Sequence, residues 1–244
     1  MGLSSALGAL LLAAFALPLT SQAQPGGPAL SARAAPALDM QGDWIAVVTE
    51  DWKFRMVTPN KGEYAGIPLN AAGRRVADAW EPATSDSCRI YGAANIMRVP
   101  GRLRIGWEDE DTLRIDTDAG RQTRMLHFDS ATSPASVPSS LQGYSAAEWR
   151  YAVNESAADA VPNHGGLKVV TTRLAPGYLR GNGVPYGERA MMTEYFNVFD
   201  APNGDQWLVV TTIVEDPEFL SRPFYTSSHF KRLRDDSGWN PTDC

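Results

Sequence analysis

Several residue patterns that carry familiar chemistries are missing from the sequence of 244 residues. It has no G-x-S-x-G nucleophile elbow, no H-E-x-x-H zinc motif, no C-x-x-C pair, no P-loop and no G-x-G-x-x-G dinucleotide fingerprint. Only three histidines occur, His127, His164 and His229, and their spacing offers no set of converging metal ligands. We therefore expect no metal and no other cofactor.

Basic residues never gather into a run, and the net charge is −6. A nucleic-acid-binding protein needs a basic face to neutralise phosphates, so the charge argues against such a partner. The remaining partner class that we expect is a small-molecule ligand.

The amino-terminal residues have the pattern of an export signal, although no Lys or Arg precedes the apolar run 7–19. Ser21 and Ala23 are the small residues expected before a cleavage site, so we predict a signal peptide over residues 1–23. The alternative is a membrane anchor, but the run is shorter than the roughly 20 residues of a spanning helix. We expect a periplasmic or secreted protein with no stable membrane insertion after cleavage.

Cysteine is scarce, with Cys88 and Cys244 as the only two. An even count in an exported protein favours a disulfide. The bridge would close a long loop and contribute about 5 kcal/mol on the chain-entropy model. Two free thiols, or a bridge to another molecule, are the alternatives.

Alternating patterns predict most of the fold. Residues 24–40 are rich in Pro, Ala, Gly and Ser and are expected to form a disordered spacer, followed by one β-barrel domain over residues 41–244. Strands are expected at 42–50, 102–107, 112–118, 122–128, 167–174, 190–199, 207–214 and 224–231. Both faces of 207–214 are nearly apolar, which predicts a central strand covered on both sides.

Two short helices are also expected. Asn70 resembles an N-cap for a helix over 71–81, which Pro82 would end. Ser145 and Glu148 match a capping box, which predicts a helical turn or two through Tyr151. Because strands dominate and no βαβ alternation is present, the pattern predicts a mainly antiparallel all-β fold, either a lipocalin-like barrel or a sandwich.

The candidate site is assembled from polar and aromatic residues on the predicted strands. Glu194 lies in an apolar run and could act with His229 as an acid–base pair. The alternative is that Glu194 pairs with an arginine of the meander 102–128 while His229 is hydrogen-bonded or exposed. The residues that we expect to contact a ligand are Asp116, Arg124, Tyr195, Tyr225 and Trp107.

Longer stretches of the chain resemble a known group. VVTEDWKFRMVTPNKG, WLVVTTIVEDP and TSSHFKR look like segments of exported bacterial proteins of unassigned function. More loosely, the TLRIDT strand with the late EDP turn is similar to lipocalin-like barrels of bacterial envelopes. The resemblance implies export and a barrel fold, and it implies no catalytic residue.

Three functions remain open from the sequence. The first is binding of a small apolar or aromatic ligand in a barrel cavity, for which the 7 Trp, 8 Tyr and 8 Phe residues supply lining. The second is a cofactor-independent lyase, isomerase or hydrolase that uses Glu194 and His229. The third is a structural envelope protein with a filled barrel.

Overall fold

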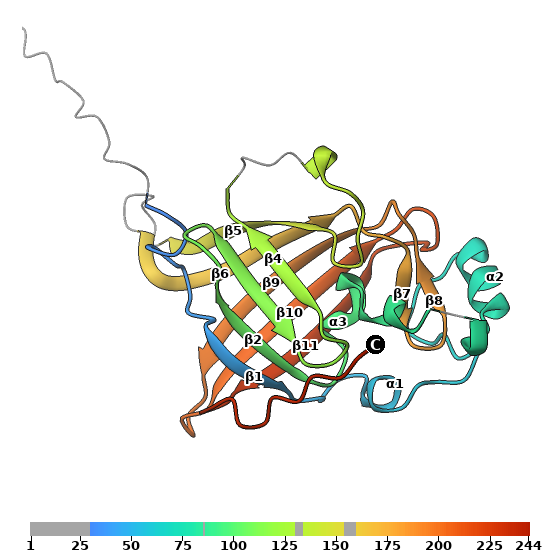
Figure 1. Ribbon diagram of the computed structural model, residues 1–244, viewed down its shortest axis with the longest axis horizontal. Helices are drawn as coiled ribbons and strands as arrows, with labels where there is room; N and C mark the ends of the chain where they lie inside the picture. The colour runs from blue at the N-terminus through green and yellow to red at the C-terminus, as the bar shows by residue number, and fades with distance from the viewer. Residues whose placement is uncertain (1–29, 85, 130–133, 154–159) are drawn as a thin grey trace, which may run out of the picture.

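Nine strands close into a barrel in the computed structural model, which describes residues 30–84, 86–129, 134–153 and 160–244 (Figure 1). The predicted signal peptide, residues 1–23, lies outside these ranges. Around the wall the order is β1-β11-β10-β9-β6-β5-β4-β3-β2, and β1 pairs with β2 to complete the circle. The barrel strands are β1 (Gly42–Ala46), β2 (Arg102–Trp107), β3 (Thr112–Thr117), β4 (Thr123–His127), β5 (Tyr144–Val153), β6 (Ala160–Thr172), β9 (Met191–Asp200), β10 (Gln206–Glu215) and β11 (Phe224–Arg232).

Strand pairing is antiparallel throughout the wall except between β4 and β5, which run parallel. The expected all-β, mainly antiparallel fold with short helices is confirmed, and the chain forms the barrel rather than the sandwich. Closure gives each of these strands a neighbour on both sides, which is how a barrel limits exposed edges.

Side chains that point inward fill the barrel. Trp44, Phe196 and Phe230 are at most 1% exposed and meet apolar residues from the other strands. The inner face of β10 is buried as well, whereas its outer face, which includes Trp207 and Val209, is only half-buried. The prediction that β10 is covered on both sides is therefore wrong, because its outer face lies on the outside of the barrel wall.

Residues 30–40 close one end of the barrel. Leu38 and Met40 join the barrel core, and the indole of Trp149 donates to the carbonyl of Ala32 at 2.9 Å. The disordered spacer predicted for residues 24–40 is thus wrong from residue 30 onward, because this apolar segment covers core side chains that would otherwise meet water.

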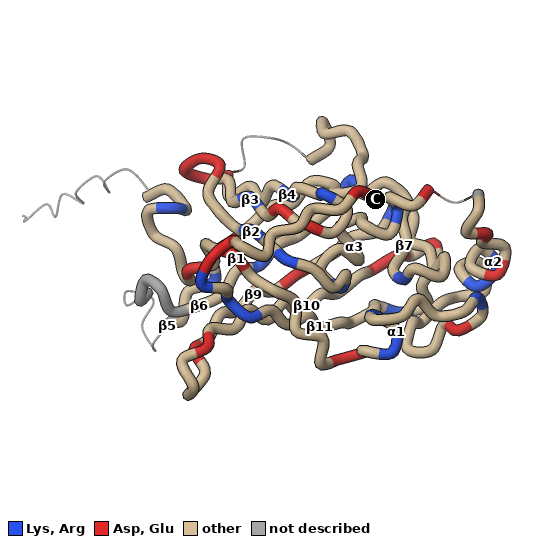
Figure 2. Tube along the Cα trace, turned by 60° about the horizontal axis from the view of Figure 1, so that its bottom comes forward, with Lys and Arg blue, Asp and Glu red and all other residues tan. Residues whose placement is uncertain are grey.

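The acidic run 108–111 forms the turn between β2 and β3 at the same end of the barrel (Figure 2). Asp111 accepts a hydrogen bond from the backbone of Ala32 at 2.8 Å, and Glu110 forms an ion pair with Arg33 at 3.5 Å. The turn therefore holds the segment that covers this opening.

A second structural unit, the cap, lies over the opposite end (Figure 1). We define the cap as residues 49–84, 86–100, 174–190 and 216–223. Its elements are α1 (Trp52–Met56), α2 (Ala71–Ala79), η1 (Pro82–Thr84), η2 (Ser87–Tyr91), α3 (Ala93–Ile96), β7 (Gly177–Arg180) and β8 (Val184–Tyr186). A further short turn, η3 (Pro134–Ser136), lies outside it. The cap has an apolar core of its own, with Tyr186 and Leu174 fully buried, and Ile96 and Met97 extend from it into the barrel core.

The two helix predictions have opposite outcomes. Asn70 caps α2 as expected, because its side-chain oxygen accepts from the backbone of Gly73 at 2.9 Å, and the helix ends at Ala79. The helix predicted for Ser145–Tyr151 is wrong, since these residues belong to β5. Pairing of β5 with β6 along most of its length outweighs a local capping pattern.

Cys88 and Cys244 form the predicted disulfide, with their Cα atoms 4.8 Å apart. The bridge joins η2 of the cap to residue 244, and the hydroxyl of Ser87 donates to the carbonyl of Cys244 at 2.7 Å. Within the described part of the chain, no helix has the length and apolar character needed to cross a membrane.

Candidate functional site

Glu194 lies inside the barrel and is paired with Arg124. The guanidinium of Arg124 donates to both carboxylate oxygens, at 2.6 and 3.2 Å, and both side chains are 0% exposed. Arg124 also reaches the hydroxyl of Thr171 at 3.4 Å. The structure thus shows the alternative expected from the sequence, a buried ion pair between Glu194 and an arginine of the meander.

His229 lies on the other side of the wall. Its neighbours Ser228 and Phe230 point inward, so the imidazole points outward, and its side chain is 29% exposed. Nδ1 lies 2.6 Å from the hydroxyl of Thr49, and Nε2 lies 3.0 Å from that of Ser227. Because Glu194 and His229 occupy opposite faces of the barrel wall, they do not form the acid–base pair considered from the sequence.

The expected ligand-contact residues are also dispersed, because they lie on different faces of the barrel wall. Asp116 lies on the outer face of β3, where it accepts from Arg114 at 2.9 Å, whereas Arg124 points inward. Tyr195 and Tyr225 are exposed on the outer wall, at 39% and 64%. Trp107 packs against Trp149 and Phe128 beneath the segment 30–40, at ring distances of 6.4 and 5.7 Å. The structure brings no two of the five expected ligand contacts into one pocket.

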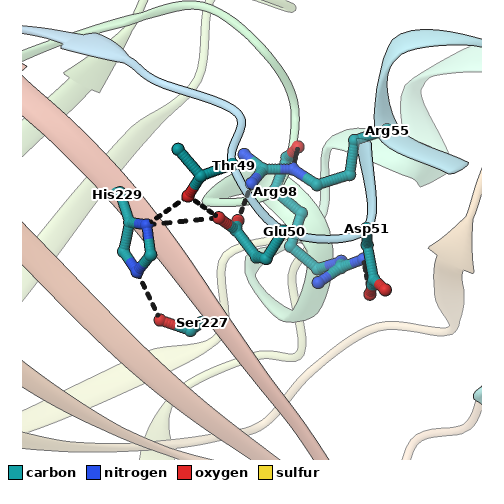
Figure 3. A network of polar contacts seen from close by, with 7 residues as sticks. All are labelled: Thr49, Glu50, Asp51, Arg55, Arg98, Ser227 and His229. Atoms are coloured by element: carbon teal, nitrogen blue, oxygen red, sulfur yellow. Dashed lines mark hydrogen bonds and ion pairs between the residues drawn. The ribbon is translucent and has the colours of Figure 1, made fainter. Parts of the chain in front are cut away.

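A polar cluster at the junction of barrel and cap contains His229 and six other residues (Figure 3). Its members are Thr49, Glu50, Asp51, Arg55, Arg98, Ser227 and His229. Arg55 forms an ion pair with Glu50 and donates through Nε to the carbonyl of Arg98 at 2.7 Å. Arg98 pairs with Asp51 at 3.0 Å. The cluster therefore connects α1 and Arg98, which follows α3, to the middle of β11.

The electrostatics of the cluster are dominated by the arginines. Glu50 lies 3.3 Å from Nδ1 of His229, but Arg55 already balances its charge. Burial, followed by the charge of Arg55, lowers the pKa of His229 below its ordinary value. The imidazole is therefore neutral at pH 7 and acts as a hydrogen-bonding partner between two hydroxyl groups.

A cleft of about 930 Å³ lies in the cap between α2 and the β7–β8 hairpin. We call it the cap cleft. Its apolar and aromatic lining includes Val76, Trp80, Tyr178, Pro185, Tyr186 and Phe219. Trp80 and Tyr178 meet edge to face with ring centres 6.3 Å apart, and the guanidinium of Arg89 lies 4.7 Å from the ring centre of Tyr178.

The position of Trp80 depends on a glycine. Gly183 has φ of +82°, and a Cβ atom there would come within 2.1 Å of the Trp80 ring. Only glycine accepts this backbone conformation readily and leaves room for the indole. The turn between β7 and β8 is thus built so that Trp80 can lie against it.

Charged residues surround the cleft with a small acidic excess. Its carboxylates are Glu81, Asp86, Glu188 and Glu218, and its guanidiniums are Arg89 and Arg189. Lys61 outside the cleft balances Glu81 at 2.5 Å. The remaining excess of one negative charge disfavours an anionic occupant.

Of the candidate residues expected from the sequence, His229 alone belongs to one of these two regions. Arg55 and Arg98 come from separate segments, and no local pattern links them. The only signal near Arg55 is the alternation of aromatic and basic residues in Trp52–Met56, which forms the short helix α1. The cleft carries no sequence signal either, because the Gly- and Pro-containing residues of β7 and β8 show no alternating pattern.

Comparison of the chain with protein-family models, with curated proteins and with solved structures finds no match.

Proposed function

We propose that the protein is an exported binding protein that holds a small aromatic molecule in the cap cleft. The observation that carries this proposal is the cleft itself, a preformed concavity of about 930 Å³ with Trp80, Tyr178 and Phe219 in its wall. Small-molecule sites have volumes of roughly 300–1,000 Å³ and are lined mainly by apolar and aromatic side chains with a few polar groups. Packed apolar side chains occupy the barrel interior, so the binding site that we propose lies outside the barrel.

The lining favours an aromatic ligand that is neutral or positively charged. Flat rings can stack or meet edge to face with Trp80 and Tyr178, and such pairs contribute about 0.5–1.5 kcal/mol beyond area burial. The net negative charge around the cleft favours a cation over an anion of the same shape. Glu188 is exposed at the mouth and is available to meet an ammonium group.

Export is part of the proposal. The disulfide between Cys88 and Cys244 supports an oxidising compartment, because such bridges are rare where thiols are kept reduced. The apolar run 7–19 with its small residues before position 24 supports a signal peptide. Both agree with the resemblance to exported bacterial proteins.

The test is calorimetric titration of the mature protein with three probes that share an indole ring and differ in charge: indole, tryptamine and indole-3-acetate. We expect saturable binding of indole and tryptamine, with indole-3-acetate the weakest of the three. Trp80→Ala should weaken binding about tenfold, which corresponds to about 1.4 kcal/mol. Trp52→Ala is the matched control, since Trp52 is 66% exposed on α1 and does not line the cleft.

Binding of none of the three probes by the wild-type protein would overturn the proposal, and so would equal binding by wild type and Trp80→Ala. Glu188→Lys gives a second readout that does not disturb the aromatic wall. It should reverse the preference between tryptamine and indole-3-acetate; an unchanged preference would contradict the assigned site.

A further inference from the structure

A second, smaller cavity in the cap is lined by three arginines from distant segments. Arg55 belongs to α1, Arg98 follows α3, and Arg180 ends β7, and together they border a space of about 180 Å³. We call it the arginine cavity. Phe54, Thr58 and Asn95 complete much of its wall. It is distinct from the cap cleft, because the two share no lining residue.

All three arginines are buried. The side chains of Arg55 and Arg98 are 2% and 6% exposed, and Arg180 as a residue is 4% exposed. Burying a guanidinium is costly unless its charge is balanced and its N–H groups are paired. Three guanidinium groups around one cavity therefore require nearby negative charge and hydrogen-bond acceptors.

The carboxylates available in the described structure number one fewer than the arginines. Glu50 pairs with Arg55, and Asp51 pairs with Arg98 at 3.0 Å. Among the described residues, Arg180 donates to two backbone carbonyls, those of Glu63 at 3.3 Å and Ala65 at 3.1 Å, and to no carboxylate. Within the described part of the chain, the cavity wall thus keeps one positive charge without a paired carboxylate.

The N–H groups of these arginines also lack enough hydrogen-bond acceptors. Nη2 of Arg55 and Nη1 of Arg98 are buried and have no hydrogen-bond partner among the residues that the structure describes. Leaving such a donor unpaired costs about 1–3 kcal/mol, and more for a charged group. Both atoms belong to residues that line the arginine cavity, so a ligand in the cavity would contact these two residues.

Burial and the charge of Arg98 both act on the other two arginines. Burial, and after it the charge of Arg98, lowers the pKa of Arg55 to about 10. The same two causes, in the same order, lower the pKa of Arg180 to about 10, although Asp51 opposes the shift. A negative charge between the three groups would relieve this repulsion.

The arginines are also held in position before any ligand arrives. Nε of Arg55 donates to the carbonyl of Arg98, and the guanidinium of Arg180 lies 4.2 Å from the centre of the Phe54 ring. Asp51, which orients Arg98, has φ of +50°, a left-handed conformation uncommon for residues other than glycine. Fixed donors lose little conformational entropy on binding, which favours affinity.

We propose that the arginine cavity is a binding site for a small oxyanion, either inorganic phosphate or sulfate or the carboxylate of a short organic acid. Guanidinium forks donate pairs of hydrogen bonds to the oxygens of these groups, whereas a lysine offers a single point charge. The volume of about 180 Å³ is large enough for a tetrahedral oxyanion or an acid of two or three carbons.

The test is thermal unfolding and calorimetric titration of the mature protein with sodium phosphate, sulfate, acetate and chloride at constant ionic strength. We expect a saturable rise in unfolding temperature with at least one oxyanion and none with chloride. The anion with the tightest binding identifies the source: phosphate or sulfate points to an inorganic anion, and acetate to an organic acid. Absence of any saturable response in the wild type, or an equal response to chloride, overturns the proposal.

Conservative variants locate the site. Arg98→Lys and Arg180→Lys keep the charge and remove the fork, so each should weaken oxyanion binding at least tenfold. Arg222→Lys, at an exposed position outside both cavities, is the matched control and should leave binding unchanged. Equal binding by all three variants contradicts the assignment. Trp80→Ala should not affect oxyanion binding, which separates this inference from the proposed aromatic site.

Discussion

The barrel and the cap treat buried charge in opposite ways. Inside the barrel a single arginine, Arg124, meets a single carboxylate, Glu194, and apolar side chains surround the pair. In the cap three buried arginines share two carboxylates and border an open cavity. The difference teaches that a buried charge by itself does not identify a site: the matched pair lies in a filled core, whereas the surplus charge beside a cavity is what the proposed oxyanion site rests on.

The largest effect that tests this comparison is expected from Glu194→Leu. The substitution leaves the Arg124 guanidinium buried without a partner, and breaking such a pair costs about 3–5 kcal/mol. Urea unfolding measures the loss. The double variant Arg124→Met with Glu194→Leu removes both charges and should recover most of the stability. If the double variant does not regain stability, the pair contributes more to folding than the balance of its own charges.

Next in size is loss of the disulfide. Cys88→Ser with Cys244→Ser should lower the free energy of unfolding by about 2–5 kcal/mol, the upper end being the chain-entropy value, because the unfolded chain gains freedom. The bridge is attached to η2 of the cap, so hydrogen exchange should rise more in the cap than in β9–β11. A uniform rise over both regions would contradict the division between them.

A smaller effect is expected at the turn of the β7–β8 hairpin. Gly183→Ala places a Cβ against Trp80 at a backbone conformation disfavoured for alanine, which costs about 1–3 kcal/mol. Gly204→Ala is a matched control: its φ is also +82°, but a Cβ there meets nothing within 4 Å. Thermal unfolding should show a larger loss for Gly183→Ala, and only that variant should weaken tryptamine binding. Equal losses would show that backbone strain alone is responsible.

The smallest effect concerns pH at the junction of the two regions. The pKa of His229 is lower in the folded protein than in the unfolded chain, so the unfolded chain binds more protons near pH 6. The resulting stability is present above the unfolded pKa of about 6.5 and is lost as pH falls through the folded value. Unfolding temperatures of wild type and His229→Gln, measured from pH 5 to 8, should diverge most at pH 8. A constant difference over this range would contradict the assigned shift.

Much of the barrel could be predicted because its signal is local. The strand expected at 102–107 is β2 without change. The one expected at 112–118 is one residue longer than β3 at its carboxyl end, and the one expected at 207–214 is one residue shorter than β10 at each end. The β7–β8 hairpin carries no such signal, since its residues are buried on both faces and alternation disappears.

The site could not be predicted for a different physical reason. Alternation correctly placed Glu194 and Tyr195 on opposite faces of one strand, and it did the same for Ser228 and His229. Alternation within one strand does not show which of its faces points into the barrel. Glu194 and His229 could therefore be assigned to the same face although they lie on opposite faces of the wall. Arg55, Arg98 and Arg180 meet only through the cap's tertiary packing.

The place of β1 in the wall has a consequence for how the molecule forms. This short strand hydrogen-bonds to β2 on one side and to β11 on the other, with Trp44 opposite both Leu103 and Arg232. The hairpins β2–β3 and β3–β4 can assemble from neighbouring segments, but the wall cannot close until β11 reaches β1 across nearly the whole chain. Such distant pairing is slow compared with local pairing. We infer that the pairing of β1 with β11 forms late in folding. A chain arrested before β11 pairs would keep an open sheet with two unprotected edges.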